Sequence, residues 1–423
     1  GAHRGDRMTA DPRPATVGIE ALDVYGGSAW ISADDLAAGR GLDPGRVTNL
    51  MLTGRSVALP FEDPVTHAVN AAKGMLDDLD PAVRDRIELV LVATESGVDY
   101  SKSIASYVHR HLQLPDRCRL LEVKQACYAA TAALQLAAGH LASGASPGAR
   151  VLLIATDVGL ADERAEYAEL ATGSGAVALL LSEQPDVLTL DLGAFGLHSF
   201  ETMDTARPGP DIELADADQS LVAYLECTVR SFADYRRRVA DVTLDGTFDH
   251  LAFHTPFAGM VRAAHRRAMR EFTDLEPAAI AADFARRVEP GLRYPAQVGN
   301  LFSGSLYLAL SSLIDDLPVL TDRARVGLFS YGSGCSSEFL SGTLGDTARR
   351  TVAARGIGPR LAARRRLDFD AYQELLPESR ACLLPRRKHT VGPPPAWLTA
   401  GTGRPPLLAL RSIDDYHRHY EWI

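Results

Sequence analysis

The same order of apolar and glycine-rich segments occurs twice along the chain. The first copy runs strand, helix, strand, glycine turn, strand: residues 87–94, the helix that begins at Cys127, residues 151–156, TGSG and residues 176–181. The second copy repeats this order: residues 250–254, the helix that begins near Asn300, residues 326–331, GSG and residues 336–342. Strands that alternate with buried helices predict a mixed or parallel sheet covered on both faces. The repeat therefore predicts a duplicated α/β fold, with a pseudo-twofold axis and a site between the halves.

The division of the chain follows from this repeat. We expect three parts: residues 1–15, a remnant of an expression tag with a disordered N-terminus; residues 16–188, the first half; and residues 189–423, the second half with insertions. Proline, glycine and charge interrupt the pattern at 203–220 and 343–407, which indicates connecting loops or insertions. The arginine-rich stretch at 349–366 indicates a solvated face.

Composition argues against several classes of function. The formal net charge of −10 disfavours non-specific nucleic-acid binding, which needs a basic surface to displace phosphate counterions. No uncharged apolar run reaches the roughly 18 residues of a membrane span. Five scattered cysteines without zinc-type spacing indicate free thiols in a reducing cytoplasm, and neither a disulfide framework nor a metal site.

Cys127 permits two interpretations. It lies in LEVKQACYAATAALQLA, between a short stretch with charged residues and a long run of alanine and leucine. Free cysteines are often inert core residues. However, the following helix is apolar or small on nearly every face, which predicts burial on all sides, and Cys127 lies at its N-terminus. The helix dipole lowers a cysteine pKa there and burial raises it, so the sequence leaves the net shift open.

Four further positions could serve a nucleophilic thiol. Glu95 follows a strand in ATESGVDYSKS, at the edge where open α/β sheets bind ligands, although it could equally cap a helix. His254 ends a strand in AFHTPF, where a structural histidine is the alternative. Asn300 opens the second buried helix, at the predicted counterpart of Cys127, and could also be a helix cap. The turn around Ser333 could donate backbone N–H groups to an oxyanion.

Competing motifs lack the context that they need. GASPG at 144–148 matches the GxSxG pattern of serine hydrolases, but a helix precedes it and a strand follows it, the reverse of the required order. His250 and His254 lie in one strand, where the spacing does not direct both rings to one metal ion. The chain also contains no glycine-rich phosphate loop with its lysine.

Together these residues resemble hydroxymethylglutaryl-CoA synthase of the thiolase superfamily. The resemblance runs from about Gly18 to the C-terminus through five motifs in the family's order: ATESGVDYSKS, QACYAATAALQLA, FHTPF, GNLFSGSLY and YGSG. It implies a thiolase-like fold of duplicated α/β halves, layered αβαβα, with two mixed sheets around buried helices. It also implies a homodimer, for which the apolar strands near 151–181 are the candidate seam.

The resemblance assigns a role to each group. It implies that Cys127 takes an acetyl group from a thioester and that Glu95 removes a proton from its methyl group. The resulting carbon attacks the β-ketone of a second thioester, which His254 and Asn300 position, and Glu95 then takes part in hydrolysis. The implied oxyanion donors are the backbone N–H groups of Cys127 and Ser333. Tyr128 follows the nucleophile as in the family and is a further candidate contact of the substrate.

Two departures indicate a branch of the family. Members that use coenzyme A carry lysines soon after the His-x-Pro-Phe motif, whereas this chain has Gly259 at the lysine position. Segments 60–68 and 203–235 resemble the branch that serves polyketide pathways and acts on acyl carrier proteins. Within the second segment, Asp204 and Arg207 match positions that flank the substrate channel. The Pro-Thr that precedes the glycine turn in coenzyme A enzymes is absent from LATGSG.

The sequence thus predicts a cytoplasmic β-branching acyltransferase. It would condense an acetyl or similar short acyl group with a β-ketoacyl chain, each carried on the phosphopantetheine of an acyl carrier protein, with no bound cofactor or metal. The alternatives are a housekeeping synthase that uses acetyl-CoA and acetoacetyl-CoA, an initiation-type ketosynthase, which would lack the Glu95 motif, and a non-catalytic scaffold of the same fold. Four arginines beyond His254 form a candidate carrier-docking patch, with a solvated helix face as the alternative: Arg262, Arg266, Arg267 and Arg270.

Overall fold

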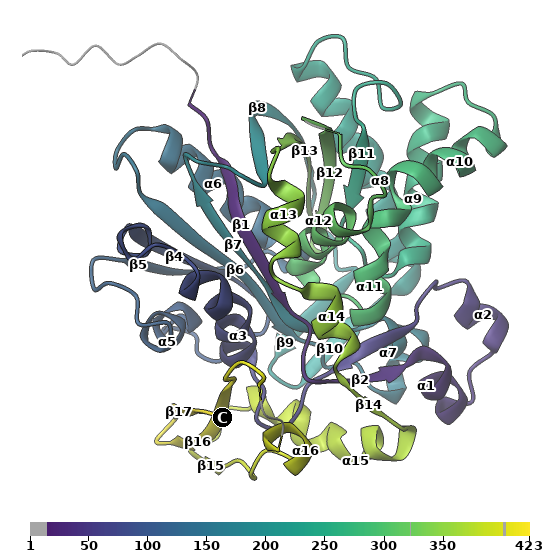
Figure 1. Cartoon of the computed structure of the whole chain (residues 1–423). Coiled ribbons are helices and arrows are strands. Elements are labelled where there is room, and N and C mark those ends of the chain that lie inside the picture. The colour runs from purple at the N-terminus through teal and green to yellow at the C-terminus, as the bar shows by residue number, and fades with distance from the viewer. Residues whose placement is uncertain (1–14, 322, 401–402) are drawn as a thin grey trace, which may run out of the picture.

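One mixed sheet of nine strands runs through the molecule (Figure 1). The computed structural model describes residues 15–321, 323–400 and 403–423, so most of the predicted tag remnant lies outside the described residues. In spatial order the strands are β11 (His250–Phe253), β12 (Arg325–Gly332), β13 (Ser336–Leu344), β8 (Leu188–Ser199), β1 (Gly18–Tyr25), β7 (Ser174–Ser182), β6 (Arg150–Val158), β4 (Ile87–Ala93) and β5 (Arg119–Val123).

The predicted repeat is present in the pairing of these strands. In the first half β4 pairs with β6 in parallel, and β6 pairs with β7 antiparallel. In the second half β11 pairs with β12 in parallel, and β12 pairs with β13 antiparallel. The sheets of the two halves are continuous, since β1 pairs along β7 and also, over Gly18–Thr189 and Ile19–Leu188, with β8. The two predicted mixed sheets are therefore joined by hydrogen bonds into one.

Two buried helices meet at the centre of the repeat. They are α6 (Ala129–Ala142) and α12 (Ser305–Asp316), and a 3₁₀ turn precedes each of them. Ala126 and Phe302 open these turns with φ angles of 46° and 56°. The residue equivalent to Cys127 is therefore Ser303, so the predicted equivalence with Asn300 was wrong by three residues, because the 3₁₀ turn stands between Asn300 and the helix.

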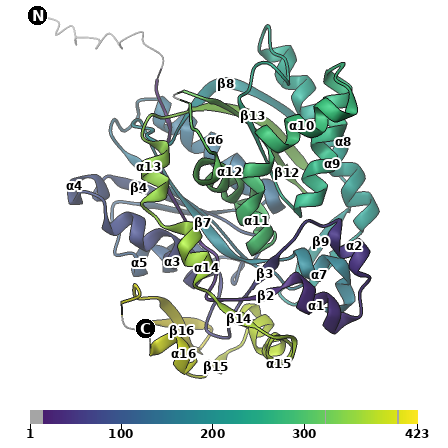
Figure 2. The same ribbon diagram turned by 45° about the vertical axis from the view of Figure 1, so that its right-hand side comes forward.

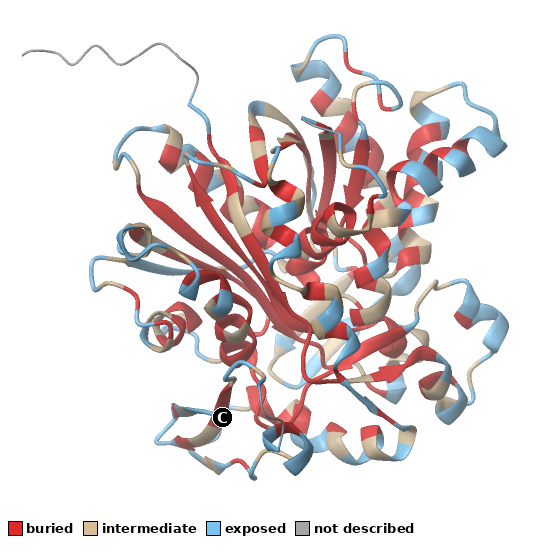
Figure 3. Cartoon of the chain, in the orientation of Figure 1, coloured by how far each residue is buried: buried red, intermediate tan, exposed pale blue. Residues whose placement is uncertain are grey.

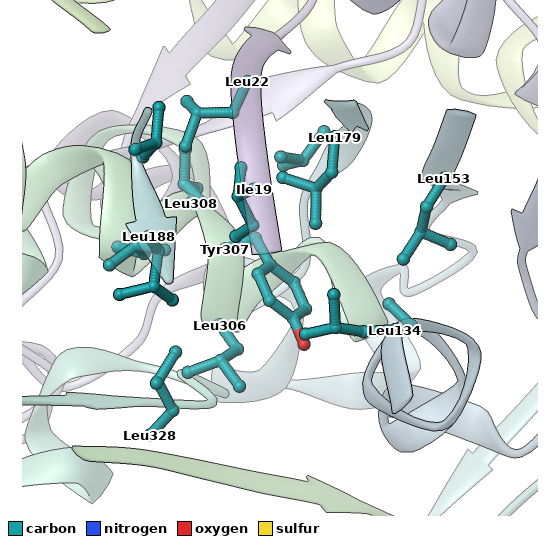
Figure 4. Close-up of a cluster of buried hydrophobic side chains, with 14 of the residues drawn as sticks. Ile19, Leu22, Leu134, Leu153, Leu179, Leu188, Leu306, Tyr307, Leu308 and Leu328 are labelled. Atoms are coloured by element: carbon teal, nitrogen blue, oxygen red, sulfur yellow. The ribbon is translucent and has the colours of Figure 1, made fainter. Parts of the chain in front are cut away.

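Helices pack on both faces of the sheet, and α6 and α12 lie between its two halves, which produces the layered arrangement (Figures 1 and 2). Outside the first half lie α3 (Pro64–Asp77) and α5 (Ile104–His111), whose apolar residues form one core with β1, β4, β6 and β7. Helices α6 and α12 share the central core with strands of both halves (Figure 4). Outside the second half lie α8 (Ala217–Arg238) and α9 (Ala258–Phe272). The predicted αβαβα order is thus the order of the layers.

The segments predicted as loops contain regular structure. Within 203–220, β9 (Thr205–Gly209) and β10 (Ile212–Ala215) form a hairpin. Within 343–407, β14 (Arg365–Leu367) pairs in parallel with β2 (Ala29–Ser32), which pairs with β3 (Gly54–Val57). Five further elements lie there: α13 (Ala348–Ala353), α14 (Ile357–Ala362), α15 (Phe369–Arg380), β15 (Lys388–Thr390) and α16 (Ala396–Thr399).

The arginine-rich stretch is also more than a solvated face. Arg364 is buried, and its guanidinium donates to the carbonyl of Gly26 and the hydroxyl of Ser56.

The described chain contains these further helices and strands: α1 (Ala33–Arg40), α2 (Pro44–Thr48), α4 (Pro81–Arg84), α7 (Tyr167–Ala171), α10 (Pro277–Arg287), α11 (Arg293–Val298), β16 (Leu408–Asp414) and β17 (His417–Trp422).

Burial changes two predictions about surfaces (Figure 3). Every residue of β6 and β7 is buried between neighbouring strands and helices, so these strands cannot form the predicted dimer seam. Helix α6 is not buried on all sides, because Leu136 is 70% exposed. Helix α12, in contrast, is buried from Ser305 to Ile314.

Candidate active site

Glu95 lies just beyond the C-terminal end of β4, beside the end of the parallel strand β6. Asp157 near the end of β6 fixes this turn, because one of its carboxylate oxygens accepts three hydrogen bonds. The donors are the Thr94 hydroxyl at 3.0 Å, the Glu95 backbone N–H at 2.9 Å and the Ser96 hydroxyl at 2.7 Å. The sequence analysis missed Asp157, although an acidic residue in the apolar strand VLLIATDV was a usable signal.

Cys127 is the middle residue of the 3₁₀ turn before α6, as predicted from its place in the sequence. The end of β12 contacts this turn closely. A Cβ atom on Gly332 would lie 2.4 Å from the backbone nitrogen of Tyr128 and 2.6 Å from the carbonyl oxygen of Gln125, so this contact requires glycine. The turn that carries Ser333 therefore lies directly against the backbone on either side of Cys127.

The thiol of Cys127 is shielded from solvent and lies near several acidic side chains. Burial raises its pKa well above the ordinary value of 9.0, and the charges of Glu95, Asp157 and Glu213 raise it further. These effects favour the neutral thiol over the thiolate. All five cysteines are free.

The carboxyl group of Glu95 is also shifted toward its neutral form. Burial raises its pKa, the charge of Asp157 adds to the increase, and the cation of Arg207 opposes it. The side-chain oxygen Oε2 of Glu95 is buried and has no hydrogen-bond partner among the described residues. Such an oxygen is tolerated more easily on a neutral carboxyl group than on a carboxylate.

His254 follows β11 and is held by its backbone. Its N–H donates to the carbonyl of Phe329 at 2.8 Å, and its carbonyl accepts from the Tyr224 hydroxyl at 2.7 Å. The imidazole lies beside the rings of Tyr224 and Tyr331, with centroids 6.2 Å and 6.4 Å away. Burial lowers the pKa of His254 to about 3, so the ring is neutral at physiological pH. Within the described residues, its buried Nδ1 atom has no hydrogen-bond partner.

The turn at Ser333 is supported from below by Asp204. One carboxylate oxygen of Asp204 accepts from the Gly334 N–H at 2.9 Å, and the other accepts from the Tyr331 hydroxyl. Asp204 is fully buried, so the structure places it beneath the turn, where it fixes the backbone of Ser333. The Ser333 N–H itself donates to no acceptor in the part of the chain that the structure describes.

Asn300 is held between the two halves. Its backbone N–H donates to the carbonyl of Ala171 at 2.7 Å, and its carbonyl accepts from the Gly173 N–H at 3.0 Å. The side-chain oxygen accepts from the Phe302 N–H at 2.8 Å and from the Ser305 hydroxyl at 2.7 Å. Since these two bonds occupy the oxygen, the side-chain NH₂ is the group that can donate to a ligand.

The remaining predicted residues lie at different distances from this centre. The Tyr128 hydroxyl donates at 2.8 Å to Glu338, which also accepts from Gln135 at 2.6 Å, so the ring beside Cys127 is fixed. Arg207, on β9, lies 4.0 Å from Glu95 between Nη1 and Oε1. The neighbouring strand contributes Glu213, which the sequence analysis missed because it lies in a segment predicted as a loop.

The predicted docking arginines lie on the surface of α9. All four are exposed, and three of them line a groove of about 360 Å³ between α9 and α10, whose apolar side includes Ile280 and Phe284. The lining arginines are Arg262, Arg266 and Arg270, whereas Arg267 lies outside the groove.

The described residues also bear on metal binding and on membrane insertion. Among the described residues, no group of three or more His, Cys, Asp or Glu side chains is arranged to hold a metal ion. The helices of the described chain include none with the length and apolar character that crossing a bilayer requires.

The site combines four features between duplicated α/β halves: a cysteine at a buried helix N-terminus, a strand-end carboxyl, a neutral histidine and a glycine turn. This combination defines an acyl-transferring enzyme of the thiolase-like class. Family models described as hydroxymethylglutaryl-coenzyme A synthase N terminal and C terminal match residues 13–186 and 274–420. The chain belongs to the hydroxymethylglutaryl-CoA synthase family, whose members transfer an acyl group and form a C–C bond.

Relatives of known function lie in two branches. The chain is 43% identical over 419 residues to the polyketide biosynthesis 3-hydroxy-3-methylglutaryl-ACP synthase of Bacillus subtilis, covering 96% of this chain and 99% of that protein. It is 34% identical over 336 residues to the hydroxymethylglutaryl-CoA synthase of Enterococcus faecalis, covering 78% and 83%.

Solved structures agree with this assignment. The crystal structure of the curacin biosynthetic pathway HMG synthase matches with a TM-score of 0.91 at 45% identity, over 96% of this chain and 100% of that one. The complex of that synthase with acetyl donor-ACP matches with a TM-score of 0.92 at 44% identity, over the same shares. The predicted family, thiolase-like fold class and similarity to the polyketide branch are therefore confirmed.

Proposed function

We propose that this protein installs a β-branch on a polyketide intermediate. It condenses an acetyl or similar short acyl group, held as a thioester on Cys127, with the β-ketone of a chain on an acyl carrier protein. Both substrates are carried on phosphopantetheine arms. The free state of the nucleophilic thiol is suited to the reducing cytoplasm.

The surroundings of Gly259 are the observation that favours a carrier protein over coenzyme A as the substrate carrier. Gly259 occupies the position at which coenzyme A enzymes of this family have a lysine. Its backbone packs so closely that a Cβ atom would lie 2.1 Å from the carbonyl oxygen of Asn49, and its N–H donates to Leu50 at 3.1 Å. The site therefore lacks a lysine and also lacks the space for any side chain there, so a cation that would hold a nucleotide phosphate is missing at this position.

Acyl transfer begins at Cys127. Its sulfur attacks the thioester carbonyl and forms a new C–S bond, the C–S bond to phosphopantetheine breaks, and the proton of the Cys127 thiol passes to the departing sulfur, which leaves as a thiol. The developing oxyanion is stabilised by the backbone N–H groups of Cys127 and Ser333, because the Gly332 contact sets these two segments against each other. The raised pKa of Cys127 keeps the thiol protonated until a donor substrate occupies the pocket.

Condensation uses the carboxyl group of Glu95 as a base. The carboxylate removes a proton from the methyl group of acetyl-Cys127, and the enolate carbon forms a bond to the β-ketone carbon. Neutral His254 and the side-chain NH₂ of Asn300 donate hydrogen bonds to the ketone oxygen, which becomes an alkoxide and takes up the proton held by Glu95 to give a hydroxyl group. Water then cleaves the thioester to Cys127 and frees the enzyme, with Glu95 assisting proton transfer.

Docking of the carrier protein involves the exposed arginines of α9. Carrier proteins are typically acidic, while this protein has a net charge of −10, so attraction requires a local basic surface. Arg262, Arg266 and Arg267 supply such a surface, with the apolar side of the groove beside them.

Mass spectrometry of the intact protein tests the proposed donor. We expect acetyl transfer from an acetyl-carrier protein to exceed transfer from acetyl-CoA at equal concentration, and Cys127→Ser to gain no acetyl mass. Cys118→Ser, which removes another partly exposed thiol, serves as the control. Equal or faster transfer from acetyl-CoA would instead identify a housekeeping synthase, and acetylation of Cys127→Ser at the normal rate would exclude Cys127 as the nucleophile.

A further inference from the structure

The β9–β10 hairpin places a buried arginine beside the proposed base. The Arg207 side chain is 9% exposed, and its Nη1 atom lies 4.0 Å from Oε1 of Glu95. Its Nη2 atom donates to the carbonyl of Val158 at 2.8 Å, and its guanidinium lies 5.9 Å from the ring centroid of Phe302. Two contacts thus fix the guanidinium, with its Nη1 atom on the side of Glu95.

Both sides of the gap between Arg207 and Glu95 contain unpaired polar atoms. Nη1 of Arg207 and Oε2 of Glu95 are buried and have no hydrogen-bond partner in the described chain. Buried polar groups are almost always paired, so the two groups have a strong tendency to meet. The 4.0 Å separation joins Nη1 to the other oxygen of Glu95, Oε1, and it is about 1 Å longer than a charge-assisted hydrogen bond. A small shift of either side chain would close it.

The same hairpin brings a carboxylate that acts in the opposite direction. One oxygen of Glu213 accepts from the Leu160 N–H at 2.9 Å, which holds the side chain beside the site. The charged groups that act on Glu95 come from three strands: Asp157 on β6, Arg207 on β9 and Glu213 on β10. Within this described set, Arg207 is the one cation, and the other two members are carboxylates.

We propose that Arg207 is a positioning residue that closes onto Glu95 and holds it as the carboxylate required for removal of the methyl proton. The charge-assisted form of this hydrogen bond requires the ionised group, because a protonated carboxyl can still accept a hydrogen bond but carries no charge. When the acetyl methyl C–H bond breaks, its electrons remain on carbon as the enolate and its proton moves to Glu95. The bond to Arg207 then weakens, which favours release of the proton later in the cycle. This inference rests on the proposed role of Glu95.

The pH dependence of methyl proton exchange tests this role. The protein is mixed with an acetyl-carrier protein in deuterated buffer, and mass spectrometry follows deuterium uptake into acetyl-Cys127. Arg207 lowers the pKa of Glu95 and Glu213 raises it. Arg207→Gln should therefore move the acidic limb of the exchange profile to higher pH, and Glu213→Gln should move it to lower pH. A shift of one pH unit corresponds to about a tenfold change in rate below the limb.

The conservative variant and the folding control complete the experiment. Arg207→Lys keeps the charge and should leave the limb nearer to that of the wild type than Arg207→Gln does. Circular dichroism and acetyl uptake establish that each variant is folded. An unchanged limb in Arg207→Gln, or shifts of the same sign in both hairpin variants, would overturn the inference. An increase in KM alone would instead make Arg207 a substrate contact, as the sequence predicted.

A variant of Glu95 separates this inference from the function on which it rests. Glu95→Gln should lose exchange by on the order of 10²–10⁴, the contribution of a positioned general base. Retained exchange in Glu95→Gln would refute the proposed base itself. Lost exchange in Glu95→Gln together with an unmoved limb in Arg207→Gln would refute only the role of Arg207.

Discussion

The three proposed catalytic residues lie in surroundings that favour their neutral forms. Burial is the largest cause of the pKa shift at Cys127, Glu95 and His254, and in each case it favours the neutral form. Surroundings of this kind give low reactivity before substrate binding, and a low dielectric strengthens electrostatic contacts once charge develops. The reactive carboxylate is therefore produced within the cycle rather than stored in the free protein.

The raised pKa of Glu95 predicts a stability effect that depends on pH. The folded protein holds the Glu95 proton more tightly than the unfolded chain does, so the wild type loses stability as pH rises above the ordinary carboxyl pKa of 4.5. Glu95→Gln cannot ionise. Its free energy of unfolding should therefore increase relative to the wild type as pH rises from about 5 toward 8, as measured by urea denaturation. Glu201→Gln, which removes an exposed carboxylate, controls for the lost charge. A constant difference between Glu95→Gln and the wild type would contradict the burial of this carboxyl group.

Sequence reasoning located the proposed catalytic residues together with Asp204 and Arg207, and it missed Asp157 and Glu213, which act on them through charge. Cys127, Glu95 and His254 follow strands or open a helix, so their position is visible from the order of elements. Asp157 and Glu213 influence the site through charge across the fold. Their effect depends on which strands become neighbours, a property that one sequence does not reveal.

At the level of elements, the packing of α9 against the loop at Asn49 is sensitive to a single methyl group. Gly259→Ala would place a Cβ atom 2.1 Å from the Asn49 carbonyl oxygen and should lower stability by about 1–3 kcal/mol despite the better helix propensity of alanine. Gly139→Ala on α6 meets nothing within 4 Å and should be neutral or stabilising by up to about 1 kcal/mol. Thermal or urea denaturation measures both. An equal stability of the two variants would show that the loop at Asn49 yields and that a lysine would fit.

The arginines of α9 give a second prediction at this scale. Arg262→Glu and Arg266→Glu should each raise the KM for the acetyl-carrier protein severalfold and leave the rate at saturation unchanged, because a rim charge acts mainly on encounter. The effect should diminish with added salt. Arg350→Glu on α13, an equally exposed arginine without a side-chain partner in the described structure, should have no such effect. A uniform loss in all three variants would indicate general electrostatics rather than docking on α9.

Periodicity predicted the repeated elements better than the segments between them. The strands at 87–93 and 250–253 end within one residue of their predicted limits, since apolar runs bounded by polar residues mark buried strands. The interpretation of 203–220 and 343–407 as connecting loops was wrong, while the alternative, that they are insertions, stays a prediction. The short strands and helices there are held by tertiary contacts, such as the pairing of β14 with β2, which local composition does not indicate.

At the scale of the whole molecule, one end of the nine-stranded sheet is open. Among the described residues, strand β5 pairs with β4 alone, and its residues Arg119–Glu122 include Leu120 and Leu121, which are 36% and 50% exposed. Helix α6 packs beside this strand and exposes Leu136. The strand at the opposite end, β11, is fully buried. Exposed apolar edge strands favour pairing with another chain, so the unpaired β5 edge, and not the interior strands β6 and β7, is the surface suited to a homodimer.

We predict that the protein dimerises through the β5 edge and that disruption of the dimer impairs the reactivity of Cys127. Light scattering at micromolar concentration should show twice the chain mass, and Leu121→Lys should shift the protein toward monomer, because two like charges would then face each other across the twofold axis. Strand β5 ends at Val123, four residues before Cys127, so a loosened edge should also slow acetyl transfer. Leu275→Lys, which adds the same charge at another exposed leucine, should remain dimeric and active. A monomeric wild type, or a Leu121→Lys variant that remains dimeric, would rule out pairing at this edge.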